Sequence, residues 1–227
     1  GSSSAVTVGL LNALHSFSGN QVSPEELAEQ ACKIEIDILG QPIGRQDQYG
    51  CAMGGINHIK FLPDDSVEVE VLEISKDTIS KMEDEFTLLY TGLTRSADSV
   101  LKEQSENTSE KISQLQLMCA QAKTAKTLLQ NGDLEGLGKL LHEGWMLKKQ
   151  LSSSVSIPEI DSLYQTILNC GATGGKLLGA GGGGFILFHG SLDVRQRISQ
   201  ALPDNQMLPL KVERNSTRII FDSSNLE

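Results

Sequence analysis

The sequence lacks a continuous apolar run of about 20 residues, the length that a membrane-spanning helix requires, and nothing in it resembles a signal peptide. It also lacks a cluster of basic side chains, since it has 19 Lys and Arg against 29 Asp and Glu and a formal net charge of -10. Nucleic-acid surfaces need clustered Lys and Arg for contacts with phosphates, so the composition argues against nucleic-acid binding. We therefore expect a cytoplasmic protein with neither a membrane nor a nucleic-acid partner.

Cysteine and aromatic residues are also few. The four cysteines form no CxxC pair and lie far apart, at Cys32, Cys51, Cys119 and Cys170. This spacing gives neither a zinc site nor a disulfide framework, so we interpret them as reduced, buried thiols. Of the 227 residues, 21% are charged. That composition is typical of a globular protein with one large core or two modest ones.

Hydrophobic periodicity and turn residues predict both helices and strands. The best-marked helix begins at Ser23, where Ser-Pro-Glu-Glu supplies an N-cap, a proline in the first turn and the acidic residue of a capping box. It is expected to end at Gly40. Residues 41–55 are so rich in glycine and polar side chains that we predict a loop outside the core.

The rest of the chain continues this mixture. Helices are expected at about 76–83, at 96–151 with breaks near residues 107 and 132, and at 158–171. Strands are expected at 56–62, 67–74 and 86–90, and the tail follows the order strand, strand, helix, strand, strand at 175–179, 184–189, 192–201, 207–213 and 217–221. Because strands and helices alternate without a strict βαβ rhythm, we predict an α+β fold rather than a doubly wound sheet.

The segment KLLGAGGGGFILF, residues 176–188, contains four consecutive glycines. A glycine run can be a flexible linker, but linkers are flanked by serine and other polar residues, whereas both flanks here are apolar. The flanks favour a tight turn between two buried strands. A turn without side chains allows another segment or a phosphate group to approach its backbone closely.

The chain begins Gly-Ser-Ser-Ser-Ala and continues directly into an apolar helical pattern. Such a start is either the remnant of an expression tag or an internal segment of a longer protein. As natural sequence it could hold a phosphate group, because the first N–H groups of a helix lack intrahelical partners and the helix dipole favours an anion. A serine hydroxyl there can ligate Mg²⁺, although the GxxxxGK[ST] pattern of a Walker A loop is absent.

Two carboxylates have alternative interpretations. Glu35 lies on the flank of an amphipathic helix, where a solvated surface carboxylate is the ordinary interpretation, and Asp47 lies near Arg45, where a plain ion pair would account for both. Phosphoryl transfer offers a more specific role. The acceptor hydroxyl needs a carboxylate that orients it or takes its proton, and the nucleotide needs Mg²⁺ held by a carboxylate and a hydroxyl.

Together these segments resemble the GHMP kinases, the family of galactokinase, homoserine kinase, mevalonate kinase and phosphomevalonate kinase. Members share a loop of the form PxxxGLGSSxA, a mid-chain loop with an acidic residue and a GAGxGG turn; here GSSSA (1–5) is similar to the end of the first motif and GAGGGG (179–184) matches the last. The resemblance favours natural sequence at residues 1–5 and implies ATP and Mg²⁺ as cofactors. It also implies a GHMP kinase fold, with the remnant of the N-terminal kinase domain at 1–74 and a ferredoxin-like C-terminal domain at 75–227.

The resemblance further implies roles for individual residues. Asp47 would be the catalytic carboxylate, and Ser3 and Glu35 would hold Mg²⁺. ATP phosphates would lie on the two loops, at Gly1, Ser2, Ser3, Ser4, Gly181, Gly182 and Gly183. The sugar substrate is placed at Arg45, Gln48, Thr91, Gly92 and Arg95. Arg95 would bind the substrate's own phosphate, because it stands at the N-terminus of the helix expected from residue 96; an exposed arginine paired with Asp98 or Asp47 is the alternative.

Within the family, four stretches resemble the D-glycero-D-manno-heptose 7-phosphate kinase branch, at residues 35–55, 88–101, 141–161 and 171–185. This implies an ATP-dependent kinase that phosphorylates the anomeric hydroxyl of the sugar phosphate to give a 1,7-bisphosphate. The alternatives are another sugar 1-kinase, of fucokinase or galactokinase type, and a catalytically silent relative that only binds sugar or nucleotide. Members carry an N-terminal segment that this chain lacks, so we expect that segment to be needed to complete the site, and self-association into a homo-oligomer is left open.

Overall fold

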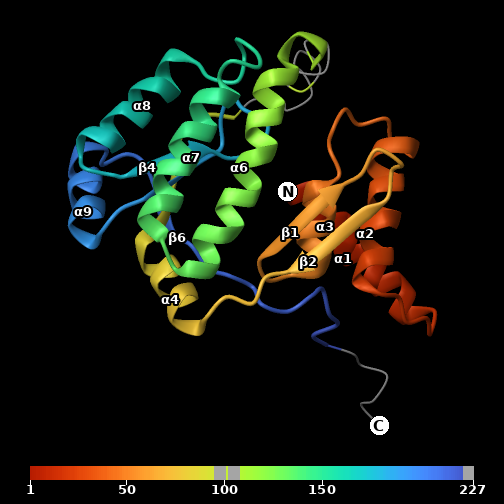
Figure 1. Cartoon of the computed structure of the whole chain (residues 1–227). Coiled ribbons are helices and arrows are strands. Elements are labelled where there is room, and N and C mark those ends of the chain that lie inside the picture. Colours follow the sequence, from red (N-terminus) through yellow and green to blue (C-terminus); the bar gives the residue numbers. More distant parts are fainter. Residues whose placement is uncertain (95–100, 102–107, 222–227) are drawn as a thin grey trace. The chain divides into compact units, whose positions relative to one another are not determined.

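The computed structural model describes residues 1–94, 101 and 108–221 (Figure 1). The chain divides into two units, Gly1–Leu72 with the C-terminal segment from Glu213, and Glu73–Val212. The predicted boundary after residue 74 lies just beyond this division, and the predicted second domain includes the C-terminal segment that here groups with the first unit. None of the helices in the described part of the chain has both the length and the apolar character that crossing a bilayer requires.

The first unit consists of helices and one β-hairpin. Its elements are α1 (Ser2–Phe17), α2 (Pro24–Cys32), the π-helix η1 (Lys33–Ile38), α3 (Gln46–Met53), β1 (Asn57–Phe61) and β2 (Val67–Val71). Its core combines apolar residues of all three α-helices, and one face of the hairpin packs against it; the core residues are Val8, Leu27, Ala28, Ala31, Cys32, Tyr49 and Ala52. The two predicted strands pair in antiparallel register as a hairpin.

The helix predicted from Ser23 begins as expected and then changes its winding. The Ser23 hydroxyl accepts from the Glu26 N–H at 3.2 Å, and the Glu26 carboxylate accepts from the Ser23 N–H at 3.0 Å, which is a complete capping box. After Cys32 the chain continues as the π-helix η1. Short π-helical turns are rare and often occur at functional sites, and this one contains Glu35.

The structure corrects the prediction of a loop at 41–55, because residues Gln46–Met53 form α3. Tyr49 and Ala52 are buried against α1 and α2, and this packing outweighs the low helix propensity of Gly50, which faces solvent. Gly54 ends the helix with a φ of +64°, and a Cβ there would lie 1.9 Å from the carbonyl oxygen of Asn215. Only glycine fits that position.

One face of α1 exposes a stripe of apolar side chains. Val6, Leu10, Leu14 and Phe17 are spaced by three or four residues and are between 54% and 92% exposed. An exposed apolar stripe of this kind marks a surface for contact with further protein.

The second unit contains a four-stranded sheet and the remaining helices. Its elements are α4 (Lys76–Glu85), β3 (Phe86–Tyr90), the 3₁₀ turn η2 (Thr108–Lys111), α6 (Ile112–Asn131), α7 (Leu134–Lys148), α8 (Pro158–Asn169), β4 (Gly174–Leu177), β5 (Phe185–His189), α9 (Leu192–Ala201) and β6 (Met207–Pro209). The strand order is β4-β5-β3-β6, and all neighbours are antiparallel. This split βαβ order is the ferredoxin-like arrangement that was predicted.

Helices α8 and α9 cover one face of this sheet (Figure 1). Ile160 and Ile167 of α8 and Ile198 of α9 are fully buried against Leu89, Ile186 and Phe188 of the central strands. Trp145 of α7 is fully buried in the same cluster, so it packs in the core. Helices α6 and α7 lie side by side, and the chain reverses between them at residues 131–133, as predicted.

The C-terminal segment differs from its prediction. The strand expected at 207–213 is limited to β6, and residues 217–221 form no strand. The C-terminal segment instead bonds to the end of α3 and to the residues just after it: the Gly55 N–H donates to the Glu213 carbonyl at 2.6 Å, and the Thr217 N–H donates to the Ala52 carbonyl at 3.0 Å.

Candidate active site

Helix α3 places Asp47 beside the start of α1. Asp47 lies in the first turn of α3, where the helix dipole favours a carboxylate. Its side chain is 43% exposed, and its Oδ2 forms an ion pair at 3.0 Å with the terminal ammonium of Gly1, the N-cap of α1. This ion pair requires a free amino group at Gly1, whereas the packing of α3 against α1 does not. The fold thus brings two predicted site segments together and leaves the carboxylate accessible.

Cys51, one turn after Asp47 on the same helix, holds the other side of Gly1. Its Sγ donates to the Gly1 carbonyl at 3.7 Å. Burial, and then the negative charge of Asp47, raise the pKa of the Cys51 thiol, so the thiol stays protonated at neutral pH and remains a donor. The sequence alone indicates no role for Cys51, because only the packing of α3 against α1 reveals the contact.

The first turn of α1 suits an anion. It contains no acidic side chain and no side-chain cap that would occupy its N–H groups. Ser2 and Ser3 are exposed, whereas Ser4 is only 2% exposed. Of the three serines, Ser2 and Ser3 are therefore the ones whose hydroxyls a ligand can reach.

Glu35 is not the surface carboxylate that the ordinary interpretation expects. Its side chain is 3% exposed, and that of Gln48 is fully buried. The Nε2 of Gln48 donates to Oε2 of Glu35 at 2.6 Å, which joins η1 to α3. Glu35 has no Lys, Arg or His partner among the residues that the structure describes.

This arrangement fits Mg²⁺, the ion predicted at Ser3 and Glu35. A buried carboxylate normally needs a compensating positive charge, and the described residues offer Glu35 only a neutral amide. The described residues contain no cluster of three or more His, Cys, Asp or Glu. Mg²⁺ does not require one, because it is usually held by one or two carboxylates together with waters and substrate phosphates.

In the second unit, the glycine loop 179–184 joins β4 to β5 as the predicted tight turn. Gly181 and Gly182 have φ values of +131° and +74°, which only glycine adopts without strain. Backbone hydrogen bonds hold the loop against two other segments: the Gly182 N–H donates to Val155 and the Gly184 N–H donates to Leu93, both at 3.0 Å.

Gly183 is a tightly packed position of the loop. A Cβ there would lie 2.5 Å from the carbonyl oxygen of Leu93. We expect Gly183→Ala to lower the free energy of unfolding by about 1–3 kcal/mol, the usual cost of overpacking, as measured by chemical denaturation. Gly9→Ala on α1, where nothing lies within 4 Å of the added carbon, is the matched control and should not destabilise the protein. Equal stability of the two variants would contradict the close packing of the loop.

Thr91 and Gly92 lie beside this loop. The Thr91 side chain is 5% exposed, and its hydroxyl donates to the Gly184 carbonyl at 2.9 Å. This bond holds the glycine loop in place, and contact between Thr91 and a substrate stays a prediction. Gly92 has a φ of +74° and open space on its Cβ side. Arg95, the fifth residue assigned to the substrate, lies outside the described residues.

Arg45 is not paired with Asp47, the simple ion pair that the sequence allowed. Its guanidinium donates to the Asp65 carbonyl at 2.9 Å and lies over the ring of Phe61 at 5.2 Å. It lines a cavity of about 900 Å³ between α2, η1 and the hairpin. Contact between Arg45 and a substrate stays a prediction, and Arg45 is the only residue assigned to the substrate that lines this cavity.

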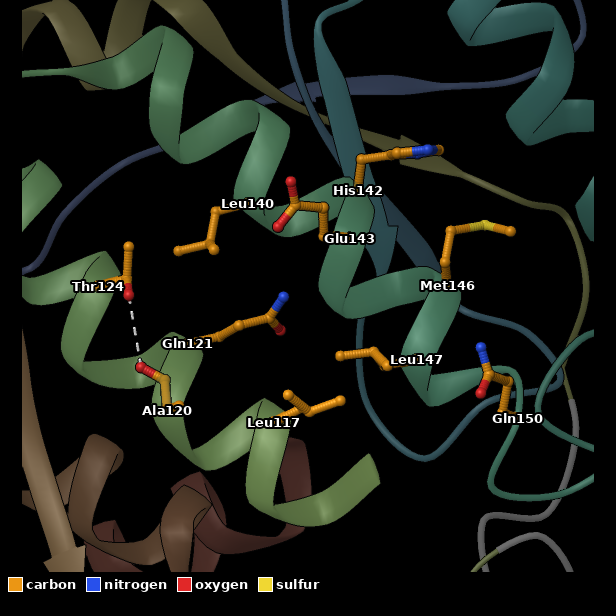
Figure 2. A pocket seen from close by; sticks show the side chains of 10 residues that line it. All are labelled: Leu117, Ala120, Gln121, Thr124, Leu140, His142, Glu143, Met146, Leu147 and Gln150. Atoms are coloured by element: carbon orange, nitrogen blue, oxygen red, sulfur yellow. Dashed lines mark hydrogen bonds between the residues drawn. The ribbon is translucent and has the colours of Figure 1, made fainter. Parts of the chain in front are cut away.

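A second cavity, of about 640 Å³, lies between α6 and α7 (Figure 2). Leu117 and Gln121 of α6 face Glu143 and Leu147 of α7 across it. None of the residues that the sequence analysis assigned to a site lines this cavity.

Further residues around the glycine loop were missed. Lys148 donates to the Gly179 carbonyl, and Val155 and Leu93 accept from the loop. Small residues in TGLT (91–94) and SSSV (152–155) are the only sequence signal for these contacts.

Comparison with known proteins finds two matching family domains. Residues 1–55 match the GHMP kinases N terminal domain, and residues 125–206 match the GHMP kinases C terminal domain. The chain is 31% identical to D-glycero-alpha-D-manno-heptose 7-phosphate kinase of Campylobacter jejuni over 209 residues, which is 91% of this chain and 61% of that protein. It is 28% identical to the bifunctional fucokinase/GDP-fucose pyrophosphorylase of Arabidopsis thaliana over 88% of this chain and 20% of that protein.

A solved structure shares the fold. It is a D-glycero-D-manno-heptose 1-phosphate kinase from Bacteroides thetaiotaomicron, with a TM-score of 0.72 and 24% sequence identity. The match covers 94% of this chain and 60% of the chain of that kinase. The chain therefore spans about three fifths of the length of these heptose kinases.

Proposed function

The chain belongs to the GHMP kinase family, and on that premise we propose that it is part of an ATP-dependent kinase acting on the anomeric hydroxyl of a sugar phosphate, D-glycero-D-manno-heptose 7-phosphate. The activity is proposed for a protein that also contains the remaining length found in the relatives, called the full-length protein below. The substrate is taken from the 31% identical Campylobacter jejuni enzyme.

The observation that carries the proposal is the packing of α3 on α1, which places Asp47 beside the start of α1. Asp47 is accessible and lies one turn before Cys51, whose thiol donates to the carbonyl of Gly1, the residue that begins a helix whose first turn suits a phosphate. A kinase needs these two features side by side, because the acceptor hydroxyl must be deprotonated next to the phosphoryl group that it attacks.

The proposed reaction follows from these positions. Asp47 orients the anomeric hydroxyl and takes its proton as the sugar oxygen forms a bond to the γ-phosphorus of ATP. The bond between the γ-phosphorus and the bridging oxygen breaks, and ADP leaves. Ser3 and Glu35 would hold Mg²⁺, which neutralises charge on the phosphate groups when it is bound. N–H groups at the start of α1 would bind the phosphates.

We propose that the remaining length found in the relatives covers the apolar stripe of α1, which no described residue buries: Val6, Leu10, Leu14 and Phe17. Activity is therefore to be measured on the full-length protein.

An L-fucose kinase is the second candidate, favoured by the similarity to the fucokinase of Arabidopsis thaliana. The two are separated by ADP release with heptose 7-phosphate, unphosphorylated heptose, L-fucose and galactose as acceptors. We expect kcat/KM to be highest for heptose 7-phosphate by at least about tenfold, because a site with a phosphate-binding group discriminates strongly against an acceptor that lacks the phosphate. A preference for L-fucose would support the second candidate, and ADP release that no sugar stimulates would contradict both.

A further inference from the structure

Gln48, which the sequence analysis assigned to the substrate, cannot reach a sugar from its place in the fold. Its side chain has no exposed surface, although its neighbour Asp47 on α3 is accessible. Its amide instead points to Glu35, with 2.6 Å between Nε2 and Oε2. A role for Gln48 must therefore act through Glu35.

We propose that Gln48 is a positioning residue that holds the Glu35 carboxylate in place for a divalent cation. The inference rests on the proposed function, in which Glu35 holds Mg²⁺. It adds the group that fixes the carboxylate and corrects the assignment of Gln48 to the sugar.

The charges around Glu35 support a cation. A buried carboxylate is strongly disfavoured unless a positive charge or several hydrogen bonds compensate it. The described residues provide one neutral donor, the Gln48 amide, and no basic side chain. That donor occupies Oε2, so Oε1 is the oxygen left to face a cation.

The Gln48 amide does not make all the hydrogen bonds of which it is capable. Its Oε1 is buried and has no hydrogen-bond partner among the described residues. Turning the amide over would place this oxygen against the carboxylate, so the hydrogen bond to Glu35 determines its orientation. An amide kept in the core with one unsatisfied oxygen is better explained by what its N–H does for Glu35 than by packing, for which leucine of similar size would serve.

The position on α3 adds a mechanical reason. Asp47 and Gln48 are consecutive on one short helix, and Gln48 ties that helix to η1 through Glu35. One helix thus carries the proposed catalytic carboxylate and fixes the proposed cation ligand. Partners that orient metal ligands in this way commonly change metal affinity by 10- to 100-fold when they are removed.

The test is Mn²⁺ binding to the full-length protein, measured by electron paramagnetic resonance with a saturating non-hydrolysable ATP analogue and no sugar present, because nucleotide phosphates complete the ligands of such an ion. We expect Gln48→Leu to raise the Kd for Mn²⁺ by about 10- to 100-fold. Gln196→Leu, the same change at an exposed position of α9, should leave the Kd unchanged. Should Gln48→Leu fail to fold, Gln48→Asn replaces it, because its shorter side chain holds the amide back from Glu35 and the same rise is expected.

Unchanged Mn²⁺ affinity in a folded Gln48 variant would overturn the inference, and so would a wild-type protein that binds no Mn²⁺. Failure of the proposed function is a separate result. A protein that binds Mn²⁺ with the expected dependence on Gln48, but transfers no phosphate to any sugar, would contradict the proposed reaction and leave the positioning role intact.

Discussion

Replacing Asp47 with asparagine in the full-length protein should lower the rate of phosphoryl transfer by at least about 100-fold, the scale of a positioned acid–base group. Asparagine keeps the shape of the side chain but cannot take the proton of the acceptor hydroxyl. The affinity for ATP should change little, because the phosphates are assigned to backbone N–H groups at the start of α1. Single-turnover kinetics with saturating sugar phosphate gives the rate, and calorimetry with a non-hydrolysable nucleotide gives the affinity.

The control for Asp47→Asn is Asp84→Asn, the same change at an exposed position of α4 in the second unit. It should leave both quantities unchanged. Near-normal turnover of Asp47→Asn would remove Asp47 from its assigned role. A large loss of nucleotide affinity with little loss of turnover would mean that Asp47 serves to hold Gly1 rather than to act on the acceptor.

Replacing Arg95 with alanine should weaken binding of the phosphorylated sugar by about 1.5–3 kcal/mol, the range for a charge-assisted hydrogen bond, and leave the unphosphorylated sugar almost unaffected. The prediction comes from the sequence, in which Arg95 follows TGLT at the N-terminus of an expected helix. A basic side chain is electrostatically unfavourable there unless an anion lies nearby.

Selectivity distinguishes the roles that Arg95 could have. The KM or Kd of heptose 7-phosphate and of unphosphorylated heptose are compared in wild type, Arg95→Ala and Arg214→Ala, an exposed arginine near the end of the chain that serves as control. Equal losses for both sugars would make Arg95 structural or catalytic. The substrate phosphate would then have to be bound elsewhere. The next candidates are Lys148, which bonds to the Gly179 carbonyl, and the N-terminal segment of the full-length protein.

The sheet and the capped helices were predictable because their signals are local. Apolar residues flank the glycine run, and the capping box consists of four consecutive residues that begin at Ser23. The elements at 174–177, 185–189 and 24–32 therefore lie close to their predicted positions. The ferredoxin-like strand order followed from the family resemblance, which the matches at residues 1–55 and 125–206 support.

Helix α3 and its contacts were not predictable from local pattern. Its eight residues include a glycine and have no strong periodicity, and they become helical because Tyr49 and Ala52 find apolar partners on α1 and α2. The burial of Gln48 and the contact between Cys51 and Gly1 both depend on that helix. Neither the burial of Gln48 nor a role for Cys51 can therefore be inferred from the expectation of a loop at residues 41–55.

The central claim is tested most directly by phosphorus NMR of the full-length protein with Mg²⁺, ATP and D-glycero-D-manno-heptose 7-phosphate. We predict that ADP forms together with a new phosphate resonance coupled to the anomeric proton, while the original sugar phosphate is retained, which identifies a 1,7-bisphosphate. Formation of ADP with inorganic phosphate alone, or phosphorylation of L-fucose in the absence of any transfer to the heptose phosphate, would contradict it.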